Sequence, residues 1–262
     1  MYRSVKRQRN IYDACMTQDL FRQNAYQTEC SATVTAINPE GVVLDQTVFY
    51  PLGGGQAGDT GVLRLANGSG LAIADTRKIK DVQGQPTSDI LHLPAPGQEG
   101  LLAQLSVGES VTAQIDWARR HRLMRFHTAT HLLCHLVPMP VNGCSITPDY
   151  ARLDFHMTDP LSKEALTAGI AALVAAAHPV ALGSVTDAEL EANPALVKSM
   201  SVSPPRGSGA VRTVQIGTGD LIDLQPCGGT HVANTAEIGA VVVIKIEKKS
   251  ANTRRVVLGF AA

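Results

Sequence analysis

The hydrophobic pattern of this chain changes character near residue 117, and that change limits the folds open to it. Residues 28–116 carry short apolar runs, rich in β-branched side chains and separated by Gly, Pro and Asn: TECSATVTAI, VVLDQTVFY, VLRLANGSG and LAIADTRKI. Such runs are typical of strands. In WARRHRLMRFHTATHLLCHLV, apolar residues instead recur at helical intervals, with no Gly or Pro before Pro138. We therefore expect a β-barrel-like domain over 1–117 and an α+β domain over 118–262.

The second domain is expected to place helices on a largely antiparallel sheet. Asp159 and Pro160 predict the start of an Ala-rich helix, LSKEALTAGIAALVAAA, and TDAELEANPALVKS predicts a shorter helix with a break at Pro194. Strands are predicted at YARLDFHM, VALGSV, AVRTVQI, DLIDL, AVVVIKIE and TRRVVLGF. In the first domain, SVGESVTAQIDW adds a strand, whereas DVQGQPTSDILHLPAPGQEG is rich in Gly, Pro and Gln and predicts loops.

Composition narrows the class of protein. The chain has 262 residues, of which 44% are hydrophobic, enough to build a sizeable core. No apolar run has the length of a membrane span, and the charged N-terminus lacks the apolar core of a signal peptide, so we expect a cytoplasmic protein with no membrane partner. The five cysteines are odd in number and widely spaced, which favours free thiols or metal ligands over a disulfide framework.

The net charge of zero carries no global signature of nucleic-acid binding, but the charge is unevenly distributed. Residues 1–118 hold 9 Lys and Arg against 12 Asp and Glu, whereas residues 119–262 hold 14 against 11. The second half is therefore the basic one. Its candidates for phosphate contacts are Arg119, Arg120, Arg122, Arg125, Lys245, Lys248, Lys249, Arg254 and Arg255.

Two pairs of metal-binding side chains share the second domain. His127 and His131 lie four positions apart on the predicted helix, the spacing at which two imidazoles on one face can bind one zinc ion. A zinc peptidase would carry Glu after the first His, and here Thr128 stands there, so the peptidase reading loses its general base. Cys227 and His231 repeat the spacing around two glycines, in PCGGTHV. The four residues form a set suited to tetrahedral zinc.

Two neighbours on the helix, Cys134 and His135, are possible substitute ligands, although ordinary packing or solvation explains both. If all four residues of the main set bind, the metal site is closed, whereas catalysis requires an exchangeable position. We therefore expect firm ligands in His127, His131 and Cys227, with His231 either a fourth ligand or yielding to water.

These motifs bring the chain to a known family. HTATHLL followed by CGGTHV resembles the editing domain shared by alanyl-tRNA synthetase and the free-standing alanyl-tRNA editing proteins of the AlaX type. The likeness continues in FYPLGGGQAGDTG (49–61), IDWARRHRLMRFHTATHLL (115–133), ARLDFHM (151–157) and IGAVVVIKIEKKSANTRRVVL (238–258). These segments resemble the glycine-rich signature of the preceding domain, the linker with the metal helix, the strand after it and the closing hairpin.

The resemblance implies a fold and an activity. It implies a β-barrel-like first domain, an editing domain of the threonyl- and alanyl-tRNA synthetase type, bound Zn²⁺, and hydrolysis of Ser-tRNA(Ala) or Gly-tRNA(Ala) at the acceptor end of the tRNA. We expect no aminoacylation and no use of ATP, because the core that binds ATP has no counterpart in the sequence. The chain is most similar to the medium-length editing proteins.

Candidate roles for single residues also follow from the resemblance. Thr130 and Gln56 are the predicted catalytic residues, with the Thr130 hydroxyl bonding the seryl side chain and Gln56 contacting RNA. Gly53, Gly54 and Gly55 are expected to form an RNA-facing loop, although tight turns in small barrels use the same residues. In the loop expected after the metal helix, the chain departs from the family pattern at Val141 and at Cys144 after Gly143, which bears on amino-acid recognition. Ala57 in GGGQA is a smaller departure.

Two other classes of function stay open at the level of sequence. One is a different zinc hydrolase, including an editor of another misacylated tRNA such as Ser-tRNA(Thr). The other is a non-catalytic RNA-binding module in which zinc is structural. Asp154 in RLDF has the pattern of a salt-bridge partner on a strand, and His92, His156 and His178 are expected to be structural.

Overall fold

The computed structural model describes residues 16–200 and 209–261, so the charged N-terminal segment and Cys15 lie outside the described residues. The expected β-barrel is present as a closed, six-stranded barrel in the order β2-β3-β7-β6-β5-β8, in which neighbouring strands pair antiparallel. Its strands are β2 (Glu29–Asn38), β3 (Gly41–Leu44), β5 (Gly61–Arg64), β6 (Gly70–Lys80), β7 (Pro86–Pro94) and β8 (Ser110–Ile115).

Strand β7 corrects the expectation of loops over residues 81–100. It closes the barrel between β3 and β6, followed by the short helix α2 (Glu99–Leu102). Pro86 and Pro94 stand at the two ends of the strand, where a missing N–H group does least harm, and Ile90, Leu91 and His92 between them are buried. The residues around these three are too polar to predict a strand, and pairing with β3 and β6 in the closed barrel stabilises it.

Before and between the barrel strands, a short two-stranded sheet holds the chain that leads to the glycine-rich segment. Strand β1 (Gln18–Asp19) pairs parallel with β4 (Gln46–Thr47), and helix α1 (Leu20–Gln23) follows β1. The single strand predicted over VVLDQTVFY is therefore broken into β3, β4 and an irregular segment. That segment delivers the glycines to the edge of the second half.

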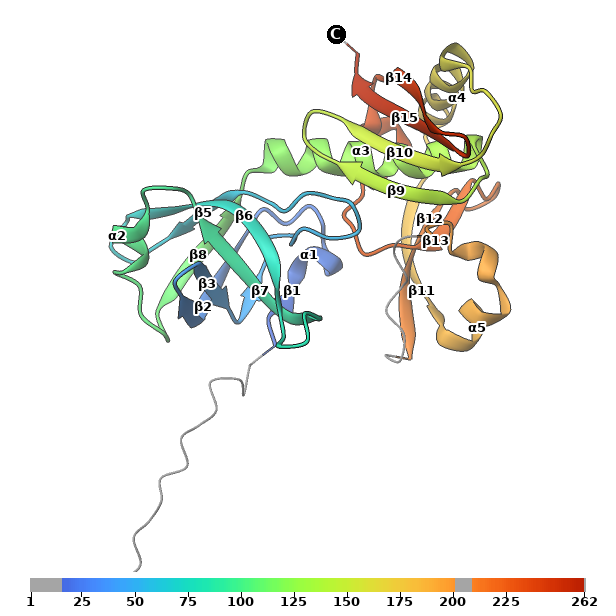
Figure 1. Ribbon diagram of the computed structural model, residues 1–262. Helices are drawn as coiled ribbons and strands as arrows, with labels where there is room; N and C mark the ends of the chain where they lie inside the picture. Colours follow the sequence, from blue (N-terminus) through green and yellow to red (C-terminus); the bar gives the residue numbers. More distant parts are fainter. Residues whose placement is uncertain (1–15, 201–208, 262) are drawn as a thin grey trace, which may run out of the picture.

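Helix α3 (Trp117–Leu136) leaves the barrel and runs into the second half, as Figure 1 shows. Its N-cap is Asp116, whose side chain accepts a hydrogen bond from the backbone N–H of Arg119. The helix is buried over most of its length, including both predicted zinc-binding histidines. The predicted helix is confirmed. Because most of its surface is buried, its side chains pack against the second half on more than one side of the helix.

Two antiparallel sheets accompany α3, rather than the one that we expected. A four-stranded sheet has the order β14-β15-β10-β9, and a three-stranded sheet has the order β11-β12-β13. The strands are β9 (Val141–Ile146), β10 (Ala151–His156), β11 (Val180–Thr186), β12 (Ala210–Ile216), β13 (Asp223–Pro226), β14 (Val241–Ser250) and β15 (Thr253–Phe260). The remaining helices are α4 (Lys163–Ala175), α5 (Asp187–Ala192), η1 (Pro194–Leu196) and η2 (Thr235–Ile238).

Three local predictions need correction in this half. Strand β9 occupies the stretch expected to be a loop after the metal helix, because pairing with β10 outweighs its weakly strand-forming sequence, VNGCSI. Helix α4 starts after Ser162, whose hydroxyl accepts from the backbone N–H of Ala165, and not at Asp159 and Pro160. Strand β13 begins at Asp223, three residues later than DLIDL predicted.

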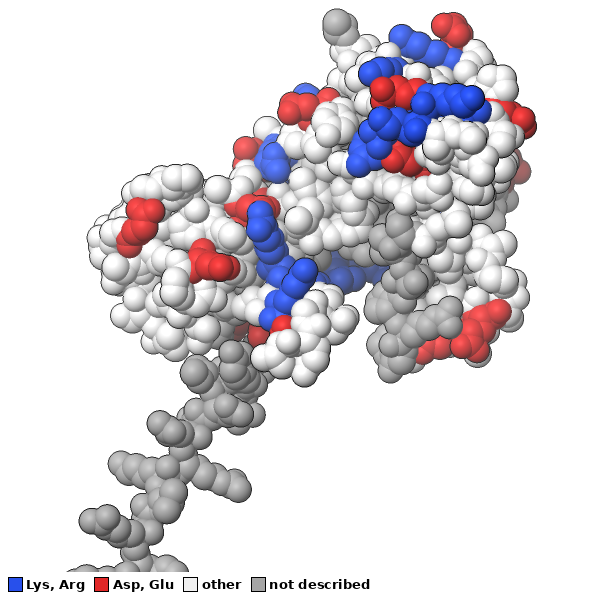
Figure 2. Space-filling model, viewed as in Figure 1, with Lys and Arg blue, Asp and Glu red and all other residues white. Residues whose placement is uncertain are grey.

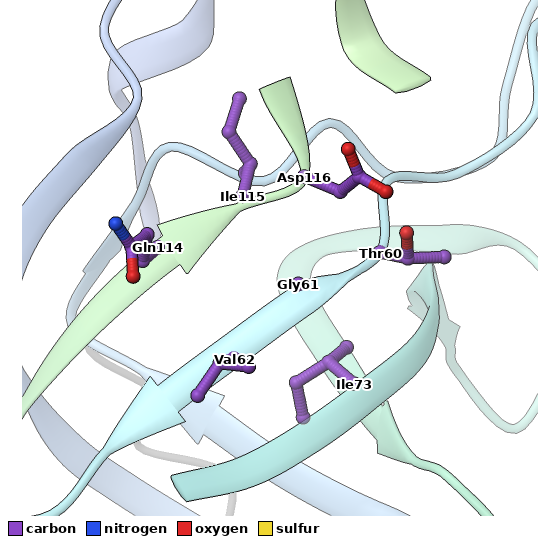
Figure 3. A pocket seen from close by; sticks show the side chains of 7 residues that line it. All are labelled: Thr60, Gly61, Val62, Ile73, Gln114, Ile115 and Asp116. Atoms are coloured by element: carbon purple, nitrogen blue, oxygen red, sulfur yellow. The ribbon is translucent and has the colours of Figure 1, made fainter. Parts of the chain in front are cut away.

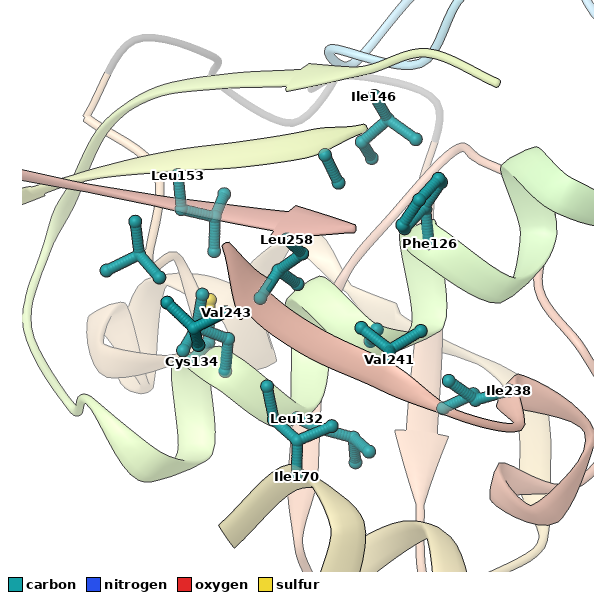
Figure 4. Packing of buried hydrophobic residues seen from close by; sticks show 14 of the residues in the cluster. Phe126, Leu132, Cys134, Ile146, Leu153, Ile170, Ile238, Val241, Val243 and Leu258 are labelled. Carbon is teal, nitrogen blue, oxygen red and sulfur yellow. The ribbon is translucent and has the colours of Figure 1, made fainter. Parts of the chain in front are cut away.

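Apolar side chains from α3, α4 and the four-stranded sheet form the larger of the cores. Figure 4 shows Phe126 and Leu132 of α3 beside Val241, Val243 and Leu258. The barrel holds a separate core, and Trp117 at the start of α3 packs against both. Within residues 16–200 and 209–261, no helix is long and apolar enough to cross a membrane.

Candidate metal centre

The four predicted ligands come together at the junction of the barrel and the second half. His127 and His131 project from α3, and Cys227 and His231 follow strand β13. One ligand atom from each of the four lies within 4.8 Å of every other. Cys227 Sγ is 3.4 Å from His127 Nε2 and 3.3 Å from His231 Nε2. For a tetrahedral ion with bonds of about 2.3 Å to sulfur and about 2.0 Å to nitrogen, the S···N separation is about 3.5 Å, so the set fits zinc.

Each histidine is oriented by a different partner on its outer nitrogen. Nδ1 of His127 donates to Gln56 Oε1 at 2.7 Å, and Nδ1 of His131 donates to Asp223 Oδ2 at 2.7 Å. Nδ1 of His231 donates to Thr128 Oγ1 at 3.1 Å. Because every Nδ1 is bonded outward, Nε2 of each ring is left for a metal ion, an arrangement that fixes tautomer and ring angle.

The charges around the cluster also suit a cation. Burial works against ionisation of Cys227, but the His127 and His231 imidazoles outweigh it and hold the pKa of the thiol well below its usual range. Burial lowers the pKa of His231 to about 3, so its ring is neutral near pH 7. Thiolate and neutral imidazole are the forms in which these residues bind metals. His131 differs, because burial opposes its protonation but the hydrogen bond with Asp223 outweighs burial and raises its pKa to about 9, so this ring has to release a proton to bind a metal ion.

Glycine at position 229 is a steric requirement of the cluster. A Cβ atom there would lie 2.0 Å from His127 Cε1 and 2.3 Å from His127 Nδ1. A Cβ at the neighbouring Gly228 would meet only Arg22 Nη1, at 3.8 Å. Of the two glycines in CGGTH, therefore, only Gly229 is needed for the close approach of the backbone to a ligand.

The glycine-rich loop is docked on strand β9. Backbone hydrogen bonds join Ile146 N to Gly55 O at 2.7 Å and Ala57 N to Ile146 O at 3.0 Å. Gly54 and Gly55 have positive φ angles of 58° and 86°, and a Cβ at Gly55 would lie 2.8 Å from Cys144 Sγ. Gly53 bridges to Gln56, and Gly54 is the exposed member of the three.

Gln56 is fully buried, in contrast to the RNA contact that we expected for it. Its Nε2 donates to Thr230 Oγ1 at 2.9 Å, and its Oε1 accepts from Thr230 N at 3.1 Å as well as from His127. The side chain is therefore occupied within the protein. Through its hydrogen bond with His127, Gln56 links the glycine-rich loop to the first histidine of the cluster.

The other predicted residues lie in varied surroundings. Thr130 is buried between the two helix ligands, and its hydroxyl donates to the backbone carbonyl of His127 at 2.7 Å. Val141 lies in the core, and burial raises the pKa of Cys144 to about 12, so that thiol is neutral. Neither substitute ligand belongs to the cluster: Cys134 is in the core, and His135 Nδ1 donates to Ile222 O at 2.7 Å.

Most of the predicted phosphate-binding arginines are engaged by the protein. Arg120 is fully buried against Asp59, and Arg119 donates to the Gly58 carbonyl. Arg122 and Arg125 donate to the carbonyls of Pro148 and Ile238, and each guanidinium lies over the Phe260 ring. Arg254 donates to backbone carbonyls that include Thr158 O, Arg255 holds Asp154, and Lys245 pairs with Glu247. Lys248 and Lys249 are exposed.

Asp223, Thr230 and Lys198 are site residues that sequence reasoning missed. Asp223 orients His131, and its other oxygen pairs with Lys198. Burial opposes ionisation of Asp223, but the bond from His131 and the charge of Lys198 lower its pKa to about 2. Its place four residues before Cys227 is a weak signal in the sequence, and nothing local marks Lys198.

A separate pocket on the barrel offers no comparable chemistry (Figure 3). Its ionisable side chain is Asp116, which is already used to cap α3. The lining residues are Thr60, Gly61, Val62, Ile73, Gln114, Ile115 and Asp116. The four-donor cluster is thus the stronger candidate for function.

Comparison with known proteins bears on what such a cluster does. The family model described as "Threonyl and Alanyl tRNA synthetase second additional domain" matches residues 211–257, and "tRNA synthetases class II (A)" matches residues 2–119. The chain is 32% identical over 245 residues to the alanyl-tRNA editing protein AlaX-M of Saccharolobus solfataricus, covering 92% of this chain and 98% of the relative. With AlaX-M of Methanosarcina barkeri it shares 34% identity over 250 residues, covering 92% and 97%.

The same region is found within larger proteins. The chain is 33% identical over 244 residues to the alanine–tRNA ligase of Sulfurisphaera tokodaii, an alignment that covers 88% of this chain and 25% of the ligase. The chain thus spans about a quarter of the ligases that it matches, whereas it spans nearly all of the two editing proteins.

Proposed function

The chain belongs to the family of alanyl-tRNA editing proteins, and from that premise we propose that it removes a wrong amino acid, serine or glycine, from tRNA(Ala) by hydrolysing the ester to the terminal ribose. The observation that carries the proposal is the convergence of four metal-binding side chains in a chain that aligns with nearly the full length of two editing proteins. We propose that residues 118–262 form the editing domain and residues 1–117 a barrel domain that supports it.

In this proposal His127, His131, Cys227 and His231 hold Zn²⁺. A bound zinc ion would supply positive charge to polarise the ester carbonyl or to activate water. Thr128 accepts a hydrogen bond from Nδ1 of His231, just as Gln56 and Asp223 accept hydrogen bonds from Nδ1 of the two helix histidines. This shared arrangement favours His231 as a fourth ligand. Zinc affinity should therefore fall as far in His231→Ala as in His127→Ala. If His231 instead yields to water, His231→Ala retains zinc while His127→Ala loses it.

Thr130 is proposed to recognise the seryl group. Its hydroxyl proton is used by the His127 carbonyl, but the oxygen still has lone pairs with which to accept a hydrogen bond. A seryl hydroxyl can donate to that oxygen and an alanyl methyl cannot, so serine is favoured over the correct amino acid. Thr130→Val should reduce deacylation of Ser-tRNA(Ala) while zinc content stays unchanged. Undiminished discrimination between Ser and Ala would remove this role.

Gln56 is proposed to act through His127 as a positioning residue, because its own amide is buried and bonded. Gly54, as the exposed glycine of the loop, and Lys248 and Lys249, as exposed cations, are the earlier RNA-binding candidates still accessible in the described residues. The arginines among those candidates would have to give up bonds within the protein to bind phosphate.

One assay tests the proposed activity. The full chain is incubated with Ser-tRNA(Ala), Gly-tRNA(Ala), Ala-tRNA(Ala) and Ser-tRNA(Thr), with and without a zinc chelator. We expect loss of serine or glycine from tRNA(Ala), sparing of Ala-tRNA(Ala), and inhibition by the chelator. Cleavage of Ser-tRNA(Thr) alone would indicate an editor of another tRNA. Binding without cleavage of any substrate would indicate a zinc-stabilised RNA-binding module.

A further inference from the structure

Among the residues that the structure describes, the donor cluster is least buried at Cys227. His127, His131 and His231 are all buried, with 4 to 5% of their surface exposed. Cys227 is half-buried and Gly228, which follows it, is exposed. Among the described residues, the side of Cys227 and Gly228 is therefore the least covered approach to the cluster for a large substrate, and we call it the opening.

Two guanidinium groups flank this opening from opposite parts of the fold. Arg22, on α1, places Nη1 3.8 Å from where a Cβ at Gly228 would lie. Arg212, on β12, donates from Nη1 to the backbone carbonyl of Cys227. Arg212 Nε is buried and has no hydrogen-bond partner among the described residues. The two side chains therefore lie at the same opening, and the Nε–H group of Arg212 is not used by any described residue.

A third cation, Lys78 on β6, lies within electrostatic reach of Arg22. Lys78 pairs in register with Ile90, and Ile90 packs in a small cluster with Phe21, the neighbour of Arg22 in the sequence. Burial and then the charge of Arg22 lower the pKa of Lys78. Asp19, which is bonded to Arg22, supplies a counter-charge. Figure 2 shows Lys and Arg side chains where the barrel faces the second half. Arg22 and Lys78 repel each other, and a bound anion would relieve that repulsion.

We propose that Arg22, Lys78 and Arg212 bind the phosphates at the 3′ end of the tRNA acceptor strand, and so hold the terminal ribose at the Cys227–Gly228 opening. This inference rests on the proposed editing function. An acceptor strand carries one phosphate charge per nucleotide, so it can contact cations that lie on three different elements. Guanidinium groups bind phosphate through paired donors, and Lys78 adds a point charge.

A competing set of cations lies elsewhere. Lys248 and Lys249 are exposed on β14, near its turn into β15, and belong to a different sheet from Arg212. The two sets predict different mutational outcomes. If the opening cations hold the acceptor end, neutralising them affects RNA binding and the KM for the substrate, and it leaves the zinc content intact.

The test measures binding of a fluorescently labelled acceptor-stem minihelix that ends in CCA and carries no amino acid, over a range of salt concentrations. The variants are Arg22→Gln, Lys78→Gln and Arg212→Gln, with Lys248→Gln/Lys249→Gln as the competing set and the exposed Lys163→Gln as the matched control. For each opening variant we expect weaker binding and a salt slope reduced by about 0.7, the value for one phosphate of a single strand. Lys163→Gln should leave both quantities unchanged.

A modified RNA makes the test specific for phosphate. In a second minihelix the last three phosphodiesters are replaced by neutral methylphosphonates. The wild-type protein should bind this RNA as weakly as the opening variants bind the normal one, and the variants should show no further loss. Arg22→Lys and Arg212→Lys, which keep the charge, should recover part of the affinity. Zinc content and melting temperature are measured for every variant.

Two outcomes would overturn the proposal. One is a salt slope lowered by the Lys248 and Lys249 changes and not by the opening variants. The other is an equal loss of affinity for the normal and the methylphosphonate RNA. Failure of the proposed function looks different: the wild-type chain then deacylates none of the charged tRNAs. Failure of this inference leaves a wild-type chain that deacylates, with variants whose KM is unchanged.

Discussion

At the scale of single residues, the candidate metal centre depends on what touches each ligand from behind. Gly229→Ala tests this most directly, because the added Cβ would overlap the His127 ring at 2.0 Å. His127 would have to move and give up its bond to Gln56. We expect the purified Gly229→Ala protein to hold much less zinc than wild type, as measured by elemental analysis after gel filtration. Gly228→Ala is the matched control, since its Cβ meets nothing closer than 3.8 Å, and it should retain zinc. Equal zinc in both variants contradicts the argument.

Asp223 gives a second prediction at the same scale. Asp223→Asn keeps the shape of the side chain but replaces the charged acceptor for Nδ1 of His131 and leaves Lys198 without its ion pair. Loss of such a partner behind a ligand weakens metal binding by about 10- to 100-fold. A competition titration with a zinc chelator measures this. Asp154→Asn is the control, because Asp154 also bonds arginine side chains but lies outside the donor cluster. It should lower stability without changing zinc affinity.

At the scale of elements, the sequence predicted what is periodic or closely spaced. The sequence predicted helix α3, the strands with alternating apolar residues and the two pairs of ligands, because each of these depends on residues within a few positions of one another. The partners of the ligands were not. Gln56 is 71 residues from His127, and Asp223 is 92 residues from His131. A local sequence pattern does not predict contacts between residues so far apart in the chain. Strands β7 and β9 were missed because pairing across the sheet, not their own composition, makes them strands.

Strand β7 supplies a pH prediction. His92 is fully buried there, donating from Nδ1 to the Val42 carbonyl and accepting at Nε2 from Thr47. Burial lowers its pKa from 6.5 to about 4. Between these two values the unfolded chain binds a proton that the folded barrel does not, so the free energy of unfolding decreases as the pH falls from 6.5. The loss is complete near pH 4 and amounts to about 3 kcal/mol.

Urea unfolding at a series of pH values measures this effect. His92→Gln removes the titrating ring, so it should be less stable than wild type at pH 7 but lose less stability between pH 6.5 and 4. The exposed His156→Gln is the control for loss of an imidazole and should follow the wild-type pH profile. A His92→Gln profile parallel to wild type would show that the buried ring does not cause the dependence.

At the scale of the whole molecule, one buried ion pair joins the barrel to the second half. Arg120 of α3 is fully buried, with Nε 3.0 Å and 2.9 Å from the two oxygens of Asp59, and it also donates to the carbonyls of Ala25 and Val48. Asp59 follows the glycine-rich loop, so the pair fixes the start of the metal helix against the loop that carries Gln56. Rigid seating of α3 on the barrel is thus a condition for placing His127.

Removing one partner of this pair should therefore affect both stability and the metal centre. Asp59→Leu leaves the Arg120 guanidinium buried without its counter-charge, which costs about 3 to 5 kcal/mol. The single tryptophan, Trp117, packs against both cores, so its fluorescence reports the junction while circular dichroism at 222 nm reports the helices. We expect Asp59→Leu to unfold at lower urea by both probes and to bind zinc more weakly. The double variant Arg120→Met/Asp59→Leu, which removes both charges, should recover much of the stability. If the double variant is no more stable than Asp59→Leu, loss of packing and not the uncompensated charge explains the effect.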